Sequence, residues 1–306
     1  MTTRRRKAGE PTAQKREAHV QEEEGDRPYT RVLLQGALVI CSLLVIRTFV
    51  DFEEKEYGQL ATINEDIPHR FIEVGCSSDY DKEKVMFKGC IPSICGRVIM
   101  DHIVTREEAA KLLDVAKKGL SLGGSNGGAS ILDLHSGALS KGDKFVDIFS
   151  LQKTKSINIF TEDDFKLYTR VKDRIQHTIT AEFGIPREKL FLTNPTFFSQ
   201  MTTKPAQTVH DEYWHPHVDK ETYGSFHYTS LLYLSEYGTD FKGGRFVFVD
   251  KDINKTVDPK RGRLSFFTSG SENLHYVEKL TSGTRYAITV SFTCNPQRAI
   301  DDPTLR

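Results

Sequence analysis

The spacing of hydrophobic and polar positions along the chain changes after Pro195. Beyond that residue, short runs rich in β-branched and aromatic residues alternate with Gly, Asp and Lys. Such runs predict short β-strands joined by hairpin-length turns. The runs are TFFSQMT, FHYTSLLYLS, GRFVFVD, RLSFFTSG and TRYAITVSFT. Residues 191–298 are therefore expected to form a β-sandwich or jelly roll.

Two helices are predicted before these strands. Thr105 and Glu108 have the spacing of a capping box, and apolar residues then recur at helical spacing until Gly119. Residues 165–183 repeat the pattern in a longer helix. The Gly-rich stretch LSLGGSNGGAS between them lacks the order of a phosphate-binding loop and predicts a flexible loop. Residues 101–190 are thus expected to be a helical region that supports the strands, which gives an α+β fold.

The amino-terminal region differs from the rest in composition. Residues 1–31 contain eight Lys or Arg, an EEEGD cluster and almost no large apolar residue, which is typical of a disordered tail. Residues 32–46 carry no charge, and the apolar character continues to Val50 with an interruption at Arg47. Residues 32–50 are predicted to be a transmembrane signal-anchor. A bilayer needs about 20 apolar residues, which is more than the uncharged run provides, so the span must include Arg47 with its side chain reaching the headgroups. A secretory signal peptide is the alternative, but its basic region would be unusually long here and no A-x-A-like cleavage site follows.

The charges on the two sides of the predicted span differ in sign. Basic residues precede it, whereas Asp51, Glu53, Glu54 and Glu56 follow it. This bias predicts a cytoplasmic amino terminus and places the rest of the chain in the secretory-pathway lumen or outside the cell. Residues 51–100 are expected to be a polar stalk and a cysteine-containing segment. The whole chain has 42 basic and 42 acidic residues, which excludes the basic footprint of a nucleic-acid-binding protein.

Four of the five cysteines lie beyond the predicted span. An even number of cysteines in an oxidising compartment predicts two disulfides. Four cysteines can pair in three ways, and the sequence does not choose among them. Four buried free thiols are the alternative. These cysteines are Cys76, Cys90, Cys95 and Cys294. Asn254 begins an Asn-Lys-Thr sequence in a polar turn between two predicted strands, which predicts N-glycosylation.

The stretch HDEYWHPHVDKETYG, residues 210–224, gathers three histidines and four acidic residues. In a strand, residues two apart face the same way, so a His-x-acid pair aims two metal ligands at one point. Such pairs arise readily by chance in a chain with 42 acidic residues. A further grouping has the H-x-H-x3-E order of cupins but lacks the glycines of that motif. The candidate sets are His210 with Glu212, His217 with Asp219, and His215 with His217 and Glu221.

The residues further along the chain distinguish between these sets. His275 lies 58 residues after His217, and Arg285 begins a predicted strand ten residues later. This order resembles that of the iron- and 2-oxoglutarate-dependent oxygenases, especially their prolyl-4-hydroxylase-like branch. The resemblance covers residues 195–295 and rests on HVD, LLYL, GGRFVF, the His275 segment and GTRYAITVSF. With its amino-terminal span, the chain looks like a membrane-anchored member of this superfamily.

The resemblance implies a double-stranded β-helix that binds Fe(II) and 2-oxoglutarate. His217, Asp219 and His275 match the metal ligands of the family, and this set leaves three iron positions open for a chelating 2-oxo acid and O2. Arg285 matches the residue that binds the distal carboxylate of 2-oxoglutarate, for which a planar guanidinium is suited. Tyr233 matches a hydroxyl donor that some members add, and the alternative for Tyr233 is a purely structural strand tyrosine.

The activity implied by the resemblance is hydroxylation of a protein side chain, such as proline or lysine, with ascorbate as a further cofactor. The substrate would be a protein or peptide in the lumen. Two other hypotheses stay open. A cupin-like metal protein would use His215, His217 and Glu221 without needing Arg285, and a lumenal binding protein would keep only a vestigial metal site.

Overall fold

The computed structural model describes residues 33, 35–42, 57–208 and 211–304. Contacts within the chain divide it into two units, Met1–Lys55 and Glu56–Arg306. The predicted tail and most of the predicted span lie outside the described residues, although residues 35–42 are helical. In the part of the chain that the structure describes, no helix has both the length and the apolar character needed to cross a membrane.

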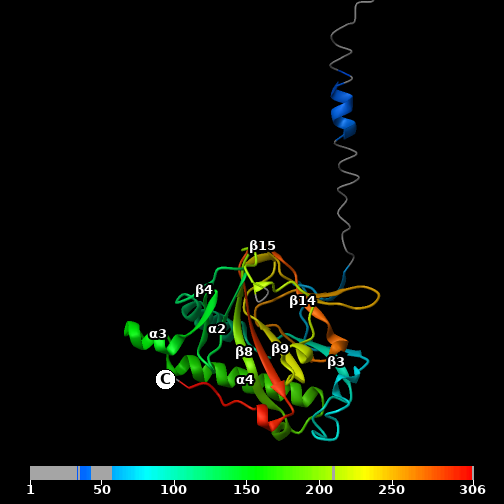
Figure 1. Ribbon diagram of the computed structural model, residues 1–306. Coiled ribbons are helices and arrows are strands. Elements are labelled where there is room, and N and C mark those ends of the chain that lie inside the picture. The colour runs from blue at the N-terminus through cyan, green and yellow to red at the C-terminus, as the bar shows by residue number, and fades with distance from the viewer. Residues whose placement is uncertain (1–32, 34, 43–56, 209–210, 305–306) are drawn as a thin grey trace, which may run out of the picture. The chain divides into compact units, whose positions relative to one another are not determined.

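The second unit is built around a large sheet of ten strands (Figure 1). The strands are β2 Arg70–Val74, β3 Cys95–Met100, β4 Gly124–Ser125, β5 Ala129–Leu132, β6 Ala138–Gly142, β7 Lys144–Asp147, β8 Phe191–Met201, β9 Tyr228–Tyr233, β13 Leu264–Thr268 and β16 Arg285–Thr293. Their order is β2, β3, β13, β9, β16, β8, β5, β6, β4, with β7 paired to β6. Neighbouring strands are antiparallel except β4 and β6.

A smaller sheet contains four short strands. In spatial order they are β1 Gly58–Ala61, β12 Lys255–Val257, β11 Phe246–Phe248 and β14 His275–Val277. β1 pairs with β12 in parallel, and the other pairs are antiparallel. A separate antiparallel pair is formed by β10 Phe241–Gly243 and β15 Leu280–Gly283.

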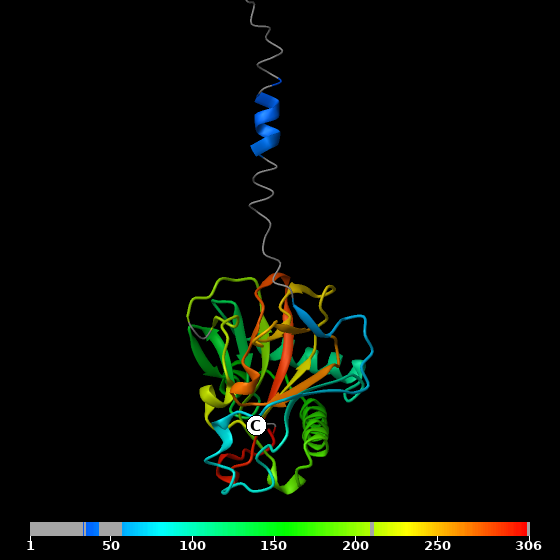
Figure 2. The same cartoon turned by 90° about the vertical axis from the view of Figure 1, so that its right-hand side faces the viewer.

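The main helices are α2 Arg106–Leu120, α3 Ile148–Lys155 and α4 Glu162–Glu182, and a short helix, α5, spans Asp219–Tyr223. The capping box of α2 is complete, because the Thr105 side chain accepts the Glu108 amide and the Glu108 side chain accepts the Thr105 amide. The course of α4 beside the large sheet is visible in both views (Figure 1, Figure 2).

Two hydrophobic cores lie on opposite faces of the large sheet. The apolar stripes of α2 and α4 form the first core with strand residues such as Leu232, and Ile175 of α4 is fully buried there. The second core joins the other face, which carries Leu231, to Phe246 of the small sheet. Leu231 and Leu232 belong to different cores because successive strand residues point to opposite faces. The face that carries Leu231 is called the inner face below.

The structure confirms the α+β class and both predicted helices. All five predicted strand runs contain a strand, namely β8, β9, β11, β13 and β16. The Gly-rich stretch differs from the predicted flexible loop, because it contains β4 and the start of β5. The sheets also extend beyond residues 191–298, since β4 to β7 lie in the expected helical region and β1 to β3 in the expected stalk and cysteine segment. These strands have two to six residues, too few for a clear alternating pattern.

Two disulfides decide the pairing that the sequence left open. Cys76 is bonded to Cys95, and Cys90 is bonded to Cys294. The prediction of two disulfides is therefore confirmed, and the alternative of four free thiols is excluded. The second bond joins positions separated by 204 residues, so it links the cysteine segment to the end of the last strand of the large sheet.

Candidate functional site

His217 and His275 lie side by side because their backbones pair. The His217 amide donates to the His275 carbonyl at 2.9 Å, and the His275 amide donates to the His217 carbonyl at 3.1 Å. Their ring centroids are 4.4 Å apart. Asp219 begins α5 two residues after His217. The HVD sequence is thus not the strand that its spacing predicted, because an isolated bridge followed by a helical turn brings the carboxylate to the rings.

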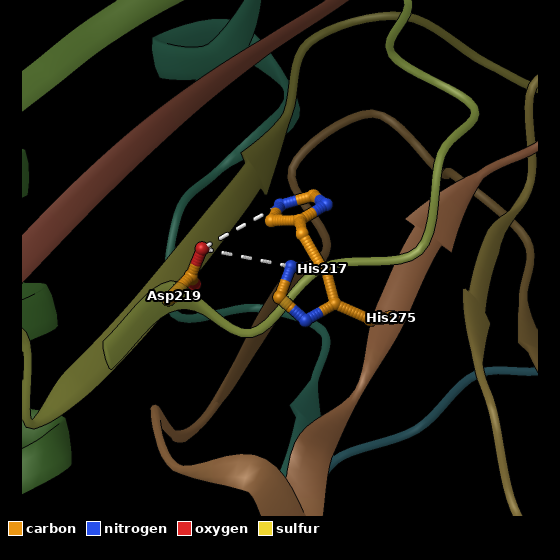
Figure 3. A group of neighbouring side chains, drawn as sticks. All are labelled: His217, Asp219 and His275. Carbon is orange, nitrogen blue, oxygen red and sulfur yellow. Dashed lines mark ion pairs between the residues drawn. The ribbon is translucent and has the colours of Figure 1, made fainter. Parts of the chain in front are cut away.

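The three side chains converge on one point (Figure 3). Asp219 Oδ1 lies 3.6 Å from His217 Nε2 and 3.7 Å from His275 Nε2. One ligand atom from each residue lies within 4.8 Å of the other two. Within the described residues, this is the one group of three His, Cys, Asp or Glu side chains with the spacing of a metal site. Asp219 and His275 are buried, whereas the His217 side chain is 28% exposed, so the group is reached from the His217 side.

Hydrogen bonds fix which atoms face the metal position. Nδ1 of His217 and Nδ1 of His275 each lie near the carbonyl oxygen two residues earlier, at 3.1 and 2.8 Å. Because a carbonyl only accepts, each Nδ1 carries the proton and each Nε2 keeps a lone pair. Thr229 donates its hydroxyl to Asp219 Oδ2 at 2.6 Å. Oδ1 is therefore the oxygen that faces the imidazoles.

Burial keeps His275 in the form that binds metals. Its ring stacks on Phe246 with centroids 5.0 Å apart and meets Phe267 edge to face at the same distance. This burial lowers the pKa of His275 to about 4, although the Asp219 carboxylate opposes the shift. A metal ligand must be a neutral imidazole, so His275 has the required form at neutral pH without releasing a proton.

Arg285 is a buried cation without an acidic partner among the described residues. It lies at the start of β16 on the inner face and is 1% exposed. Nη1 contacts Met201 Sδ at 3.4 Å, whereas Nε and Nη2 have no hydrogen-bond partner. The guanidinium carbon lies 5.5 Å from the ring centroid of Tyr233, whose buried hydroxyl also has no partner. An unpaired buried charge is costly, so these groups fit an anionic ligand.

The pKa values of this pair agree with that environment. Burial lowers the pKa of Arg285, which still stays charged because guanidinium has a very high intrinsic pKa. Burial raises the pKa of Tyr233 to about 12, so its hydroxyl keeps the proton that it could donate. A guanidinium and a phenol hydroxyl together suit a carboxylate, and the His-Asp-His group suits Fe(II). The site therefore has donors for both expected cofactors.

The other candidate residues do not join the metal group. His215 is exposed, and its Nδ1 lies against the carbonyl of Glu212. Glu221 is exposed on α5. His210 lies outside the described residues. The structure thus does not gather the cupin-like set of His215, His217 and Glu221.

Two hydroxyl groups of the site were not predicted from the sequence. Thr229, which contacts Asp219, lies in the run FHYTSLLYLS with period-two spacing to Tyr233, so this spacing could have placed both on one face. Ser265 of β13 is buried on the inner face with a hydroxyl that has no partner. No local pattern distinguishes Ser265 from an ordinary strand serine.

Comparisons with known proteins identify the family. The 2OG-Fe(II) oxygenase superfamily matches residues 203–293, a range that includes the metal group, Tyr233 and Arg285. The human protein named 2-oxoglutarate and iron-dependent oxygenase domain-containing protein 3 is 54% identical over 277 residues, which cover 90% of this chain and 86% of that protein. The Xenopus tropicalis protein of the same name is 58% identical over 245 residues, or 80% of this chain and 77% of that protein. Human prolyl 3-hydroxylase 2 is 29% identical over 224 residues, or 65% of this chain and 30% of that protein. The chain therefore belongs to the 2OG-Fe(II) oxygenase superfamily, and its cofactors are Fe(II) and 2-oxoglutarate.

Proposed function

We propose that the protein is an active dioxygenase that couples decarboxylation of 2-oxoglutarate to hydroxylation of a protein side chain. The observation that carries this proposal is the state of Arg285, a buried guanidinium with two unpartnered nitrogens. If the site no longer bound a ligand, this unpaired charge would destabilise the fold and have no binding role. A pocket that regularly binds a carboxylate accounts for it. In this proposal the two sheets are the layers of a double-stranded β-helix.

The proposed metal ligands are His217, Asp219 and His275. Together they present two neutral nitrogens and one oxygen, and the hydrogen bonds to both Nδ1 atoms and to Asp219 Oδ2 hold these ligands in place. When bound, Fe(II) with 2-oxoglutarate supplies the oxidation of a C–H bond by O2. The protein contributes the orientation of the ligands and the exclusion of water by the aromatic residues around His275.

The proposed co-substrate ligands are Arg285 and Tyr233. Nε and Nη2 of Arg285 lie on one edge of the guanidinium, so they are suited to bind both oxygens of the distal carboxylate of 2-oxoglutarate. The Tyr233 hydroxyl is suited to donate a third hydrogen bond to the same group. These contacts would pair three buried polar atoms that have no partner within the described chain.

The proposed substrate is a proline or lysine side chain in a protein or peptide. The similarity to human prolyl 3-hydroxylase 2 supports this class, because that relative's name specifies a prolyl substrate. The partial exposure of His217 supports access for a large substrate on that side of the metal group. Ascorbate is proposed as the reductant that keeps the iron ferrous.

Turnover by the full chain tests the proposed activity. The protein with Fe(II), O2 and ascorbate should convert 2-oxoglutarate to succinate and CO2, and proline- or lysine-containing peptides should increase the rate. Mass spectrometry should find one added oxygen atom in the substrate peptide. Protein that binds both cofactors yet forms no succinate, with or without peptides, would be a binding protein instead.

We also propose that residues 32–50 anchor the protein in a secretory membrane, with the amino terminus in the cytoplasm and the catalytic unit in the lumen. The helical residues 35–42 include the exposed side chains Leu38, Val39 and Ile40, which suit a lipid environment. Two disulfides in the second unit suit an oxidising compartment.

Asn254 is expected to carry a glycan if this topology holds. The residue is half-buried and lies directly before β12, in the connection from β11. Endoglycosidase treatment of the protein from cells should increase its mobility on a gel, and Asn254→Gln should abolish that change. If endoglycosidase treatment does not change the mobility and added protease digests the catalytic unit in sealed microsomes, the topology is the reverse of the one proposed.

A further inference from the structure

A disulfide closes residues 76–95 into a segment that we call the clamp segment. It runs from Cys76 to Cys95, the first residue of β3, to which Cys76 is bonded. All residues between the two cysteines are described, and none of them belongs to a strand. Their side chains contact two parts of the chain that carry the metal group. These are residues 268–275, which end at His275, and the start of α5 at Asp219.

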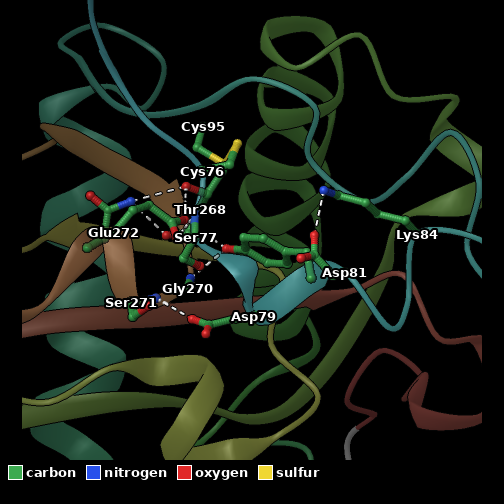
Figure 4. The surroundings of a disulfide bond; sticks show 12 residues. Cys76, Ser77, Asp79, Asp81, Lys84, Cys95, Thr268, Gly270, Ser271 and Glu272 are labelled. Carbon is green, nitrogen blue, oxygen red and sulfur yellow. Dashed lines mark hydrogen bonds and ion pairs between the residues drawn. A yellow bond between two sulfur atoms is a disulfide. The ribbon is translucent and has the colours of Figure 1, made fainter.

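The first contact is with Glu272, three residues before His275. Tyr80 of the clamp segment donates its hydroxyl to Glu272 Oε1 at 2.8 Å. The Ser77 amide donates to Glu272 Oε2 at 3.3 Å, beside the disulfide (Figure 4). Tyr80 is fully buried, so water does not compete for its bond.

Two backbone amides of residues 268–275, which we call the His275 loop, also bind the clamp segment. The Gly270 amide donates to the Tyr80 hydroxyl at 2.5 Å. The Ser271 amide donates to Asp79 Oδ2 at 2.6 Å (Figure 4). The Tyr80 hydroxyl therefore holds the loop both as a donor and as an acceptor.

A buried arginine continues this connection to the metal group. Arg97, two residues beyond Cys95, is buried and forms an ion pair with the partly exposed Asp250 at 2.6 Å. Its Nε donates to Asn273 Oδ1 at 2.7 Å. The carbonyl of Asn273 in turn accepts the proton of His275 Nδ1 at 2.8 Å. The residues on both sides of the disulfide thus reach the loop that orients His275.

A second arm of the clamp segment reaches α5. Glu83 Oε2 lies 2.5 Å from Nζ of Lys220, the residue directly after Asp219. The same oxygen lies 3.2 Å from Nε2 of His227, which is fully buried. The bond from His227 and the nearby Lys220 ammonium lower the pKa of Glu83 to about 2, although burial opposes the shift. Glu83 is therefore a charged partner that fixes the start of α5.

We propose that Tyr80 and Glu83 are positioning residues of the metal site, and that the clamp segment sets the separation between the His275 loop and the start of α5. The inference rests on the proposed function, because it takes His217, Asp219 and His275 as the metal ligands. Those ligands come from two stretches of chain about 58 positions apart, and the clamp segment binds both. Loss of the Tyr80 contact to the His275 loop, or of the Glu83 contact to Lys220, lets one ligand move relative to the others.

The metal affinity of a Tyr80→Phe variant tests this inference. The change removes one hydroxyl that both donates to Glu272 and accepts from Gly270. Contacts that orient metal ligands typically contribute about 10–100-fold in affinity, so the dissociation constant for Co(II) should rise by about tenfold or more. Titration of the full chain with Co(II), followed by its visible absorption, measures both affinity and ligand geometry.

Tyr168→Phe is the matched control. Tyr168 of α4 is also a buried tyrosine, and its hydroxyl lies 2.8 Å from His135 Nε2, a contact that involves neither the clamp segment nor the loops that carry the metal ligands. Both variants should lose some thermal stability, but only Tyr80→Phe should weaken Co(II) binding and change the Co(II) spectrum. Equal Co(II) affinities and spectra for Tyr80→Phe and the unmodified protein would overturn the inference.

Two further variants keep the test decisive. If Tyr80→Phe does not fold, Glu83→Gln replaces it, because this change keeps the size of the side chain while it removes the charge that holds Lys220 and His227. Weaker Co(II) binding supports the clamp, and unchanged binding refutes it. His217→Ala separates the two proposals, because unchanged Co(II) affinity in that variant would contradict the proposed metal site itself.

Discussion

Replacement of His217, Asp219 or His275 by alanine is expected to abolish 2-oxoglutarate turnover. Each change removes one of three protein ligands, and the remaining two leave Fe(II) weakly held and wrongly oriented. Asp219→Ala also leaves the two imidazoles without the carboxylate that lies 3.6 and 3.7 Å from their Nε2 atoms. Iron content of the purified variants and succinate formation measure the effect.

His215→Ala is the matched control for these variants. Its ring centroid lies 5.4 Å from that of His217, but the side chain is exposed and does not join the metal group. The control should therefore keep iron and activity. Loss of iron from His215→Ala with retention by His217→Ala would favour the cupin-like set that includes Glu221.

Arg285→Ala is expected to weaken 2-oxoglutarate binding while leaving Fe(II) binding nearly intact. A charge-assisted hydrogen bond contributes about 1.5–3 kcal/mol. At about 1.4 kcal/mol per tenfold change, the loss is roughly 10–100-fold in apparent affinity. Arg285→Lys should recover part of it, because the charge remains although the two-point geometry is lost. Titration of 2-oxoglutarate at matched iron content measures the effect.

Arg261→Ala serves as the control for the loss of a guanidinium. Arg261 already pairs with Asp240 at 3.0 Å and is partly exposed, so its charge is compensated without a ligand. Its removal should leave the 2-oxoglutarate requirement unchanged. An equal requirement in Arg285→Ala and the unmodified protein would contradict the assignment of Arg285 to the distal carboxylate.

The parts of the fold that the sequence predicts are those with local signals. The capping box at Thr105 and Glu108 marks the start of α2, because two reciprocal hydrogen bonds need only that spacing. The aromatic and β-branched runs of β9, β13 and β16 bury both faces between two cores, so they are rich in β-forming residues throughout. Arg285 likewise begins β16, as its sequence position indicates.

Other parts depend on contacts between distant residues and have no local signal. The disulfide pairing follows from where the fold places Cys76, Cys90, Cys95 and Cys294. The short strand β1 is stabilised by its pairing with β12, almost two hundred positions away in the chain. The sequence marks the clamp segment only as a cysteine-containing stretch, and its contacts with the loops that carry the metal ligands arise only in the folded unit.

The geometry of the candidate metal site was predictable in its residues but not in its backbone. The resemblance to the oxygenase family indicates His217, Asp219 and His275, and the structure brings all three together. The predicted strand for HVD is replaced by a bridge and a helical turn, because His217 alone pairs with His275 and α5 begins two residues later at Asp219. A period-two pattern over three residues is too short to distinguish these conformations.

The most direct test of the proposed site is the visible absorption of the Fe(II)-loaded full chain when 2-oxoglutarate is added without oxygen. Chelation of Fe(II) by a 2-oxo acid produces a charge-transfer band, which requires both the metal ligands and the open positions beside them. We predict that the band appears in the unmodified protein, needs about 10–100-fold more 2-oxoglutarate in Arg285→Ala, and is absent in His275→Ala. Iron-loaded protein without any band, or an equal band in His275→Ala, would contradict the proposed site.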